Sequence, residues 1–135
     1  MRVAVAAAGL LLAFRAFACG YCVEDKIAST YDHAVVVGAL ERKHHIAFFH
    51  IDGSLPAGAD ARRTLERLAE SAAGVDKASA RVSVDTATLS FAFDPRRTSL
   101  DAAHKAVERK LAPRGLSLMP LRVMERAADL KTVAR

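Results

Sequence analysis

The sequence predicts an α+β domain whose strands and helices follow one another in the order β-α-β-β-α-β. Three observations predict this fold class. Between residues 44 and 124, four short segments either alternate apolar and polar residues or are rich in β-branched and aromatic residues, as strands are. Two other segments repeat apolar residues at helical spacing, one after the first strand and one after the third. Turn-forming residues, glycine above all, separate these segments.

The first half of this unit is predicted to be a strand, a loop and a helix. The strand covers residues 44–52, and the turn-forming residues 53–58 follow it as a loop. Apolar side chains then recur at helical spacing, which predicts a helix over residues 59–72. Gly74 follows this helix, where a glycine commonly terminates one.

The second half begins with a predicted hairpin. Alternating residues predict strands over 75–85 and 89–93, joined by a short turn. A second helix is predicted over residues 99–112, and Thr98 with Asp101 three residues later resembles a capping box at its start.

Residues 116–124 complete the unit as a fourth strand. The resulting order is the split βαβ, or ferredoxin-like, arrangement, with a four-stranded antiparallel sheet and two helices on one face. In this arrangement the first and third strands lie inside the sheet, and the fourth lies at an edge. Pro120 falls in the fourth strand, and a proline is tolerated at an edge because it cannot donate a ladder hydrogen bond.

An extra N-terminal helix is predicted over residues 22–41, where apolar residues again follow helical spacing. Its apolar face needs a partner. In the first strand, Ile46 and Phe48 point away from the side that the other two helices cover, so both faces of this strand are apolar. The extra helix is therefore expected on the second face of the sheet, with Val23, Ile27, Tyr31 and Val35 packed over Ile46 and Phe48.

Residues 1–18 have the pattern of a cleavable signal peptide. Arg2 supplies a positive start, residues 3–14 form an uncharged apolar run, and Ala16-Phe17-Ala18 offers small residues before a predicted cleavage site at Cys19. The apolar run is shorter than the roughly 20 residues that a spanning helix needs. The sequence therefore predicts a periplasmic or secreted protein with no membrane span after cleavage.

The predicted organisation has four parts. Residues 1–18 are the signal peptide, residues 19–42 carry a cysteine motif and the extra helix, residues 43–124 are the ferredoxin-like domain, and residues 125–135 are a polar tail. The whole chain has a net charge of +5, of which Arg2 and Arg15 contribute two units. The basic residues are scattered and lack interleaved aromatic residues, which argues against a nucleic-acid partner.

Several glycines and apolar runs carry a resemblance to a known family. Gly53, Gly58, Gly74-Val75, the segment from Ala80 to Pro95 and Gly115 stand where similar features stand in heavy-metal-associated domains. The resemblance covers about seventy residues, from Phe49 to Leu118, and implies the ferredoxin-like fold. It also implies binding of soft metal ions through a Cys-x-x-Cys pair in the loop after the first strand.

The chain departs from the family at that loop. The positions that correspond to the two loop cysteines fall at about Pro56 and Ala59, and neither residue can ligate a metal. The usual site of the family is therefore expected to be absent.

A different Cys-x-x-Cys, Cys19-Gly20-Tyr21-Cys22, holds the only two cysteines of the chain. Paired thiolates suit Cu(I) or Zn(II), because soft sulfur ligands select such ions. Three other interpretations stay open. The pair could be a redox dithiol, although no strand precedes it as in a thioredoxin-like βα unit. It could be an inert disulfide of an oxidising compartment, or Cys19 could carry a lipid anchor.

His50 is the histidine best placed to complete a thiolate site. If the extra helix packs antiparallel to the first strand, the cysteine motif returns to the end of the strand where His50 lies. His33 is excluded as a ligand because eleven residues of helix would separate it from Cys22 by about 16 Å. The predicted metal ligands are therefore Cys19, Cys22 and His50, and the half-buried structural histidine is the alternative for His50.

The remaining candidates are expected to have ordinary roles. His44, His45 and His104 are predicted to be solvated, and Met119 and Met124 to be packing residues. No pattern of catalytic residues stands out, so no enzyme activity is expected. The sequence predicts an exported protein that binds or handles copper or zinc and has an envelope protein as a candidate partner. The alternatives are a non-catalytic interaction module with a lost metal site, or a thiol redox protein.

Overall fold

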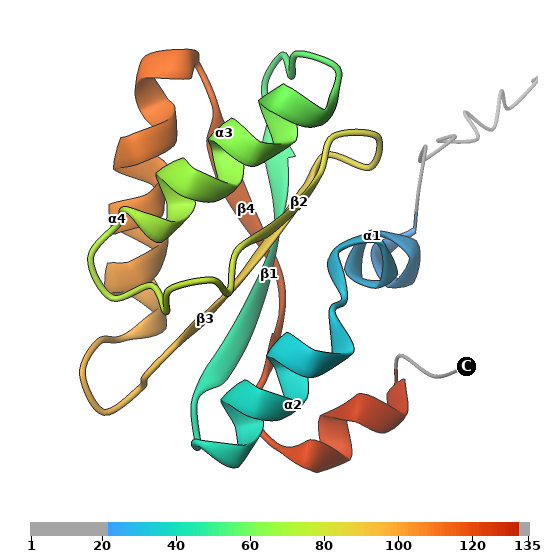
Figure 1. Cartoon of the computed structure of the whole chain (residues 1–135), viewed down its shortest axis with the longest axis vertical. Coiled ribbons are helices and arrows are strands. Elements are labelled where there is room, and N and C mark those ends of the chain that lie inside the picture. Colours follow the sequence, from blue (N-terminus) through green and yellow to red (C-terminus); the bar gives the residue numbers. More distant parts are fainter. Residues whose placement is uncertain (1–21, 133–135) are drawn as a thin grey trace, which may run out of the picture.

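A computed structural model describes residues 22–132 (Figure 1). The predicted signal peptide, residues 1–18, and Cys19 lie outside the described residues and stay predictions. Among the described residues, four strands form one antiparallel sheet: β1 (His45–Asp52), β2 (Arg81–Ser83), β3 (Thr88–Phe93) and β4 (Ser117–Met124).

The strand order is β2-β3-β1-β4, so β1 and β3 lie inside the sheet. Helix α3 (Ala59–Glu70) follows β1, and α4 (Leu100–Leu111) follows β3. Together these elements give the predicted ferredoxin-like order, β1-α3-β2-β3-α4-β4. Pro120 pairs with Phe49 from the edge strand β4, which confirms the placement that its missing N–H required.

Helices α3 and α4 cover one face of the sheet and enclose the larger core (Figure 1). Ala47, Phe49 and Ile51 of β1 point into it, and each is at most 1% exposed. The rings of Phe49 and Phe91 stack with centroids 5.3 Å apart. The first strand therefore presents the predicted face to the two helices.

The second face of the sheet carries a separate, smaller core. Its members include Ile46 and Phe48 of β1 and Met124 of β4, all at most 1% exposed. Helices α1 (Val23–Thr30) and α2 (His33–Glu41) cover this face, on the side of the sheet opposite α3 and α4 (Figure 1). This arrangement confirms the prediction that N-terminal helical residues cover the second face.

The prediction of one continuous N-terminal helix over residues 22–41 is wrong. The chain breaks at Tyr31 and Asp32, both of which have extended backbone angles. Asp32 begins α2 as its N-cap, because its carboxylate accepts a hydrogen bond from the Val35 N–H at 3.2 Å. Two of the predicted packing residues do not face the sheet: Val36 is buried in place of Val35, and Val23 is 42% exposed.

The first strand of the hairpin is much shorter than the predicted 75–85. Between Val75 and β2, the only pairing is an isolated bridge from Val75 to Phe93. Ala78 has a φ of 59°, which turns the backbone out of the strand. The Ser79 hydroxyl oxygen then accepts from the Ala92 N–H at 3.1 Å, so a side chain replaces a ladder hydrogen bond.

The caps of α4 differ slightly from the prediction. Ser99, and not Thr98, is the N-cap, and its hydroxyl accepts from the Ala102 N–H at 3.0 Å. After β4, residues Ala127–Thr132 form a short 3-10 helix. Within residues 22–132, no helix is long and apolar enough to cross a membrane.

Candidate metal centre

Cys22 stands at the start of α1 and is exposed. It is the residue that precedes the first helical turn, and its carbonyl accepts the Lys26 N–H at 3.1 Å. Cys22 therefore directly precedes the first turn of α1, which ends at Lys26, and its own backbone is extended. A thiol in this position is open to an incoming ion.

Helix α1 is held to the sheet at both ends. Near its start, Glu24 forms a bidentate ion pair with Arg122 of β4, and this pair lowers the pKa of the Glu24 carboxyl. Near its end, the Ser90 hydroxyl of β3 donates to the Thr30 carbonyl at 3.3 Å. The helix thus crosses the second face of the sheet with its first turn over β4 and its last turn over β3.

His50, the predicted third ligand, is half-buried near the end of β1. The Lys26 ammonium group lies 3.1 Å from the His50 Nδ1 and donates to the Thr86 carbonyl at 2.7 Å. Since an ammonium group can only donate, His50 Nδ1 is the acceptor of this bond. The structure therefore connects His50 to the first turn of α1 through Lys26, at the predicted end of β1.

The described residues do not by themselves form a complete metal site. Within residues 22–132, no group of three or more His, Cys, Asp or Glu side chains is placed to hold a metal ion. The loop after β1 supplies no ligand at Pro56 or Ala59. Cys22 and His50 contribute one sulfur and one imidazole, and Cys19 lies outside the described residues. The roles of Cys19, Cys22 and His50 as ligands stay predictions.

A polar cluster that the sequence did not predict lies at the other end of β1. His44 was expected to be solvated, but its side chain is only 15% exposed and lies between two carboxylates. Its Nδ1 is 2.6 Å from Asp76, and its Nε2 is 3.5 Å from Asp94. The His44 cluster, defined as His44, Asp76 and Asp94, ties the start of β1 to the segments on either side of the β2–β3 hairpin.

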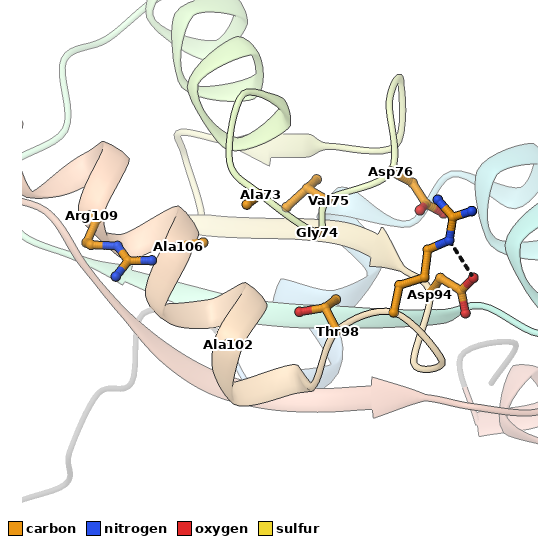
Figure 2. A pocket seen from close by; sticks show the side chains of 10 residues that line it. Ala73, Gly74, Val75, Asp76, Asp94, Thr98, Ala102, Ala106 and Arg109 are labelled. Carbon is orange, nitrogen blue, oxygen red and sulfur yellow. Dashed lines mark ion pairs between the residues drawn. The ribbon is translucent and has the colours of Figure 1, made fainter.

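The two carboxylates of this cluster also border a pocket of about 510 Å³. Figure 2 shows Asp76 and Asp94 at one end of the pocket and Arg109 of α4 at the other. Arg96 donates to Asp94 through its side chain and its backbone N–H, and these hydrogen bonds lower the pKa of Asp94 to about 2. Asp94 is paired with Arg96, and Asp76 lies 3.7 Å from the Arg42 guanidinium. Because both carboxylates already have a cationic partner, the cluster is best explained as a structural one.

This pKa predicts a loss of stability in acid. Folding lowers the pKa of Asp94 from its ordinary 3.8 to about 2, so its contribution to stability is complete above pH 3.8 and disappears as the pH falls to about 2. Urea unfolding measures the free energy of unfolding of the wild type and of Asp94→Asn at each pH. The difference between the two should shrink as the pH falls from 3.8 to about 2. Asp101→Asn, at an exposed carboxylate, is the control. A gap that stays constant from pH 5 to pH 2 would contradict this.

Two further side chains correct the sequence-based expectations. His104 is not solvated: its ring lies 4.9 Å from that of Phe49, and its Nε2 lies 3.0 Å from the Leu118 carbonyl oxygen. Met124 is fully buried, as expected of a packing residue, but Met119 is 57% exposed. Met119 therefore does not have the packing role predicted for it.

The sequence matches no family model, and no curated protein matches it. The solved structures to which the chain is similar include two at low sequence identity. Oxidized MerP from Ralstonia metallidurans CH34 has 18% sequence identity and a TM-score of 0.46, with 58% of this chain and 99% of that chain covered.

The second similar structure is the N-terminal domain of a potential copper-translocating P-type ATPase from Bacillus subtilis in its Cu(I)-loaded state. It has 22% sequence identity and a TM-score of 0.45, with 61% of this chain and 92% of that chain covered.

Proposed function

We propose that this protein is an exported, non-catalytic metal-binding protein that holds one soft ion, copper(I) or zinc(II), through the thiolates of Cys19 and Cys22. The observation that carries the proposal is the placement of Cys22. Its exposed thiol begins a helix that is fixed to the sheet, one turn from the lysine that contacts His50. The donor set is soft sulfur with an imidazole nearby, which is the set that copper(I) and zinc(II) prefer.

The charge around the thiols also supports the proposal. Two thiolates around a monovalent copper ion carry one net negative charge. Lys26, four residues after Cys22, brings a positive charge to the first turn of α1 that can offset it. His50 can then act as a third ligand if its bond to Lys26 is exchanged for a bond to the metal.

A metal titration tests this function. The reduced, unlipidated protein is titrated with copper(I) and with zinc(II), and bound metal is counted by native mass spectrometry. One equivalent is expected for the reduced protein and none for the protein with an oxidised cysteine pair, because a disulfide has no thiolate to offer. If the reduced wild type takes up neither metal above background, the proposal is wrong.

The second candidate function is a non-catalytic interaction module of the cell envelope. The absence of ligands at Pro56 and Ala59 favours it, since the metal loop of the resembled family has no donor here. This function predicts a partner protein and no metal uptake in either redox state. The same titration therefore separates the two candidates.

A further inference from the structure

The fold gathers basic side chains on the outer side of the layer that α3 and α4 form, although these residues are scattered in the sequence. Arg67 of α3 is exposed and lies two residues from both Leu65 and Ala69, which are buried against the sheet. Arg109 stands in the same relation to two buried residues of α4. Residues two apart on a helix point to different sides. Both arginines therefore project away from the sheet, on the side that α3 and α4 cover together (Figure 1).

Two more exposed cations, Lys110 and Arg114, extend this surface. We define the basic face as Arg67, Arg109, Lys110 and Arg114. Arg114 belongs to the short 3-10 helix that follows α4, and it lines the same pocket as Ala61 at the start of α3. The basic face therefore extends over both helices.

The glutamates of the two helices are engaged elsewhere. Glu70 follows Arg67 by three residues, which is a spacing that permits an ion pair on a helix. Instead, Glu66 and Glu70 accept N–H groups of β2 and of the residue before it, at 3.1 and 3.2 Å. Glu108 accepts from the Leu118 N–H of β4 at 2.9 Å. These carboxylates thus cap backbone donors at the two edge strands and leave the arginines without a partner.

The exposed aspartates of the helical layer do not balance the charge either. Asp60 is paired with Arg63 at 2.7 Å, and Asp101 is paired with Lys105 at 2.9 Å. Within residues 22–132, no side chain of the basic face forms an ion pair. The outer side of α3 and α4 therefore carries four positive charges that the described part of the chain leaves unpaired.

The neighbours of these charges favour a charged surface as the partner. Among the described residues, the exposed large hydrophobic side chains are Val23 and Met119, and neither lies on α3 or α4. Protein–protein interfaces are usually centred on buried aromatic or apolar anchors, which this helical layer does not offer among its exposed residues. Anionic lipid headgroups attract lysine and arginine side chains through charge and need no such anchor.

We infer that the basic face binds the anionic headgroups of a lipid membrane. The domain then lies on the membrane with α3 and α4 toward the lipid, and no part of it crosses the bilayer. Helix α1 covers the opposite face of the sheet, so the exposed Cys22 at its start is turned toward water (Figure 1). The attachment depends on charge, so it is reversible and sensitive to salt.

Sedimentation with lipid vesicles tests the inference. The unlipidated protein, purified after removal of residues 1–18, is mixed with vesicles of two compositions. One contains phosphatidylglycerol and phosphatidylcholine in equal parts, and the other contains phosphatidylcholine alone. The test variant combines Arg67→Gln with Arg109→Gln, which removes two charges of the basic face.

The matched control combines Arg126→Gln with Lys131→Gln. It removes the same charge from two exposed residues near the 3-10 helix Ala127–Thr132. Leu130 of that helix packs on the smaller core, so the control residues lie on the face opposite α3 and α4. Melting temperatures of both double variants report whether they fold.

The wild type is expected to bind the anionic vesicles and not the neutral ones. Raising the salt concentration from about 0.1 M to about 1 M should release it, since the Debye length shortens from about 10 Å to about 3 Å. The test variant should bind about 25-fold more weakly, because each basic residue near an anionic surface contributes roughly a factor of five. The control variant should bind as the wild type does.

Four results would overturn the inference. The first is a wild type that does not bind anionic vesicles, and the second is equal binding to both kinds of vesicle. The third is an equal loss in the control variant, which would show that net charge alone is sensed. The fourth is a wild type that binds soluble polyglutamate but not the vesicles, which would assign the basic face to an acidic protein. No metal takes part in this experiment, so its outcome is independent of the proposed function.

Discussion

Replacing Ile27 by Asp is expected to lower the free energy of unfolding by about 3 kcal/mol or more, because it buries an unpaired charge. Ile27 is 0% exposed and packs in the smaller core with Ile46 and Phe48. Its neighbours in that cluster are hydrophobic side chains, which cannot pair with a carboxylate. Urea unfolding followed by circular dichroism gives the measurement.

Ala28→Asp is the matched control for this change. It introduces the same charge at the next residue of α1, which is exposed, and should leave stability almost unchanged. If Ile27→Asp does not fold at all, Ile27→Ala provides the measurement, with an expected loss of about 2–5 kcal/mol. A wild-type unfolding curve for both Ile27 variants would show that α1 is not part of the cooperative domain.

Replacing either cysteine by serine is expected to abolish binding of copper(I) and zinc(II). A serine hydroxyl is not deprotonated at neutral pH and is a hard donor, so the remaining single thiolate is left without its partner. Val23→Ser is the control at an exposed neighbour of Cys22 and should bind as the wild type does. His50→Ala should weaken binding less, since both sulfurs remain.

The competing chemistries of the cysteine pair give different results in the same preparation. An inert disulfide predicts a mass two hydrogens lower than the dithiol form and resistance to mild reductants. A redox pair predicts easy reduction, turnover with a dithiol partner and no dependence on His50. A lipidated Cys19 predicts a heavier, detergent-extracted protein with one free thiol. Metal uptake that survives Cys22→Ser would contradict the thiolate account.

Most of the fold could be predicted because periodicity reports burial. The apolar residues of β1 alternate between two cores, and that alternation indicated both the sheet and the need for a covering on its second face. Pro120 indicated an edge strand because of its missing N–H. These signals are local in the sequence, and the structure agrees with each of them.

The features that could not be predicted depend on single hydrogen bonds or on contacts distant in sequence. Asp32 ends one helix and begins another through one side-chain bond, which apolar spacing alone does not reveal. The His44 cluster unites residues that are far apart in the chain. The bulge that places Met119 on the same face of the sheet as Arg122 appears only when β4 is paired with β1, so the sequence indicated packing for that residue.

The central claim is that sulfur atoms of this chain hold a soft metal ion, and X-ray absorption at the copper edge tests it most directly. The reduced protein is loaded with one equivalent of copper(I), and the sulfur and nitrogen neighbours of copper are counted. The account predicts a shell dominated by sulfur in the wild type, an unchanged shell in Val23→Ser, and no copper held in Cys22→Ser. A shell made only of nitrogen and oxygen would contradict the account.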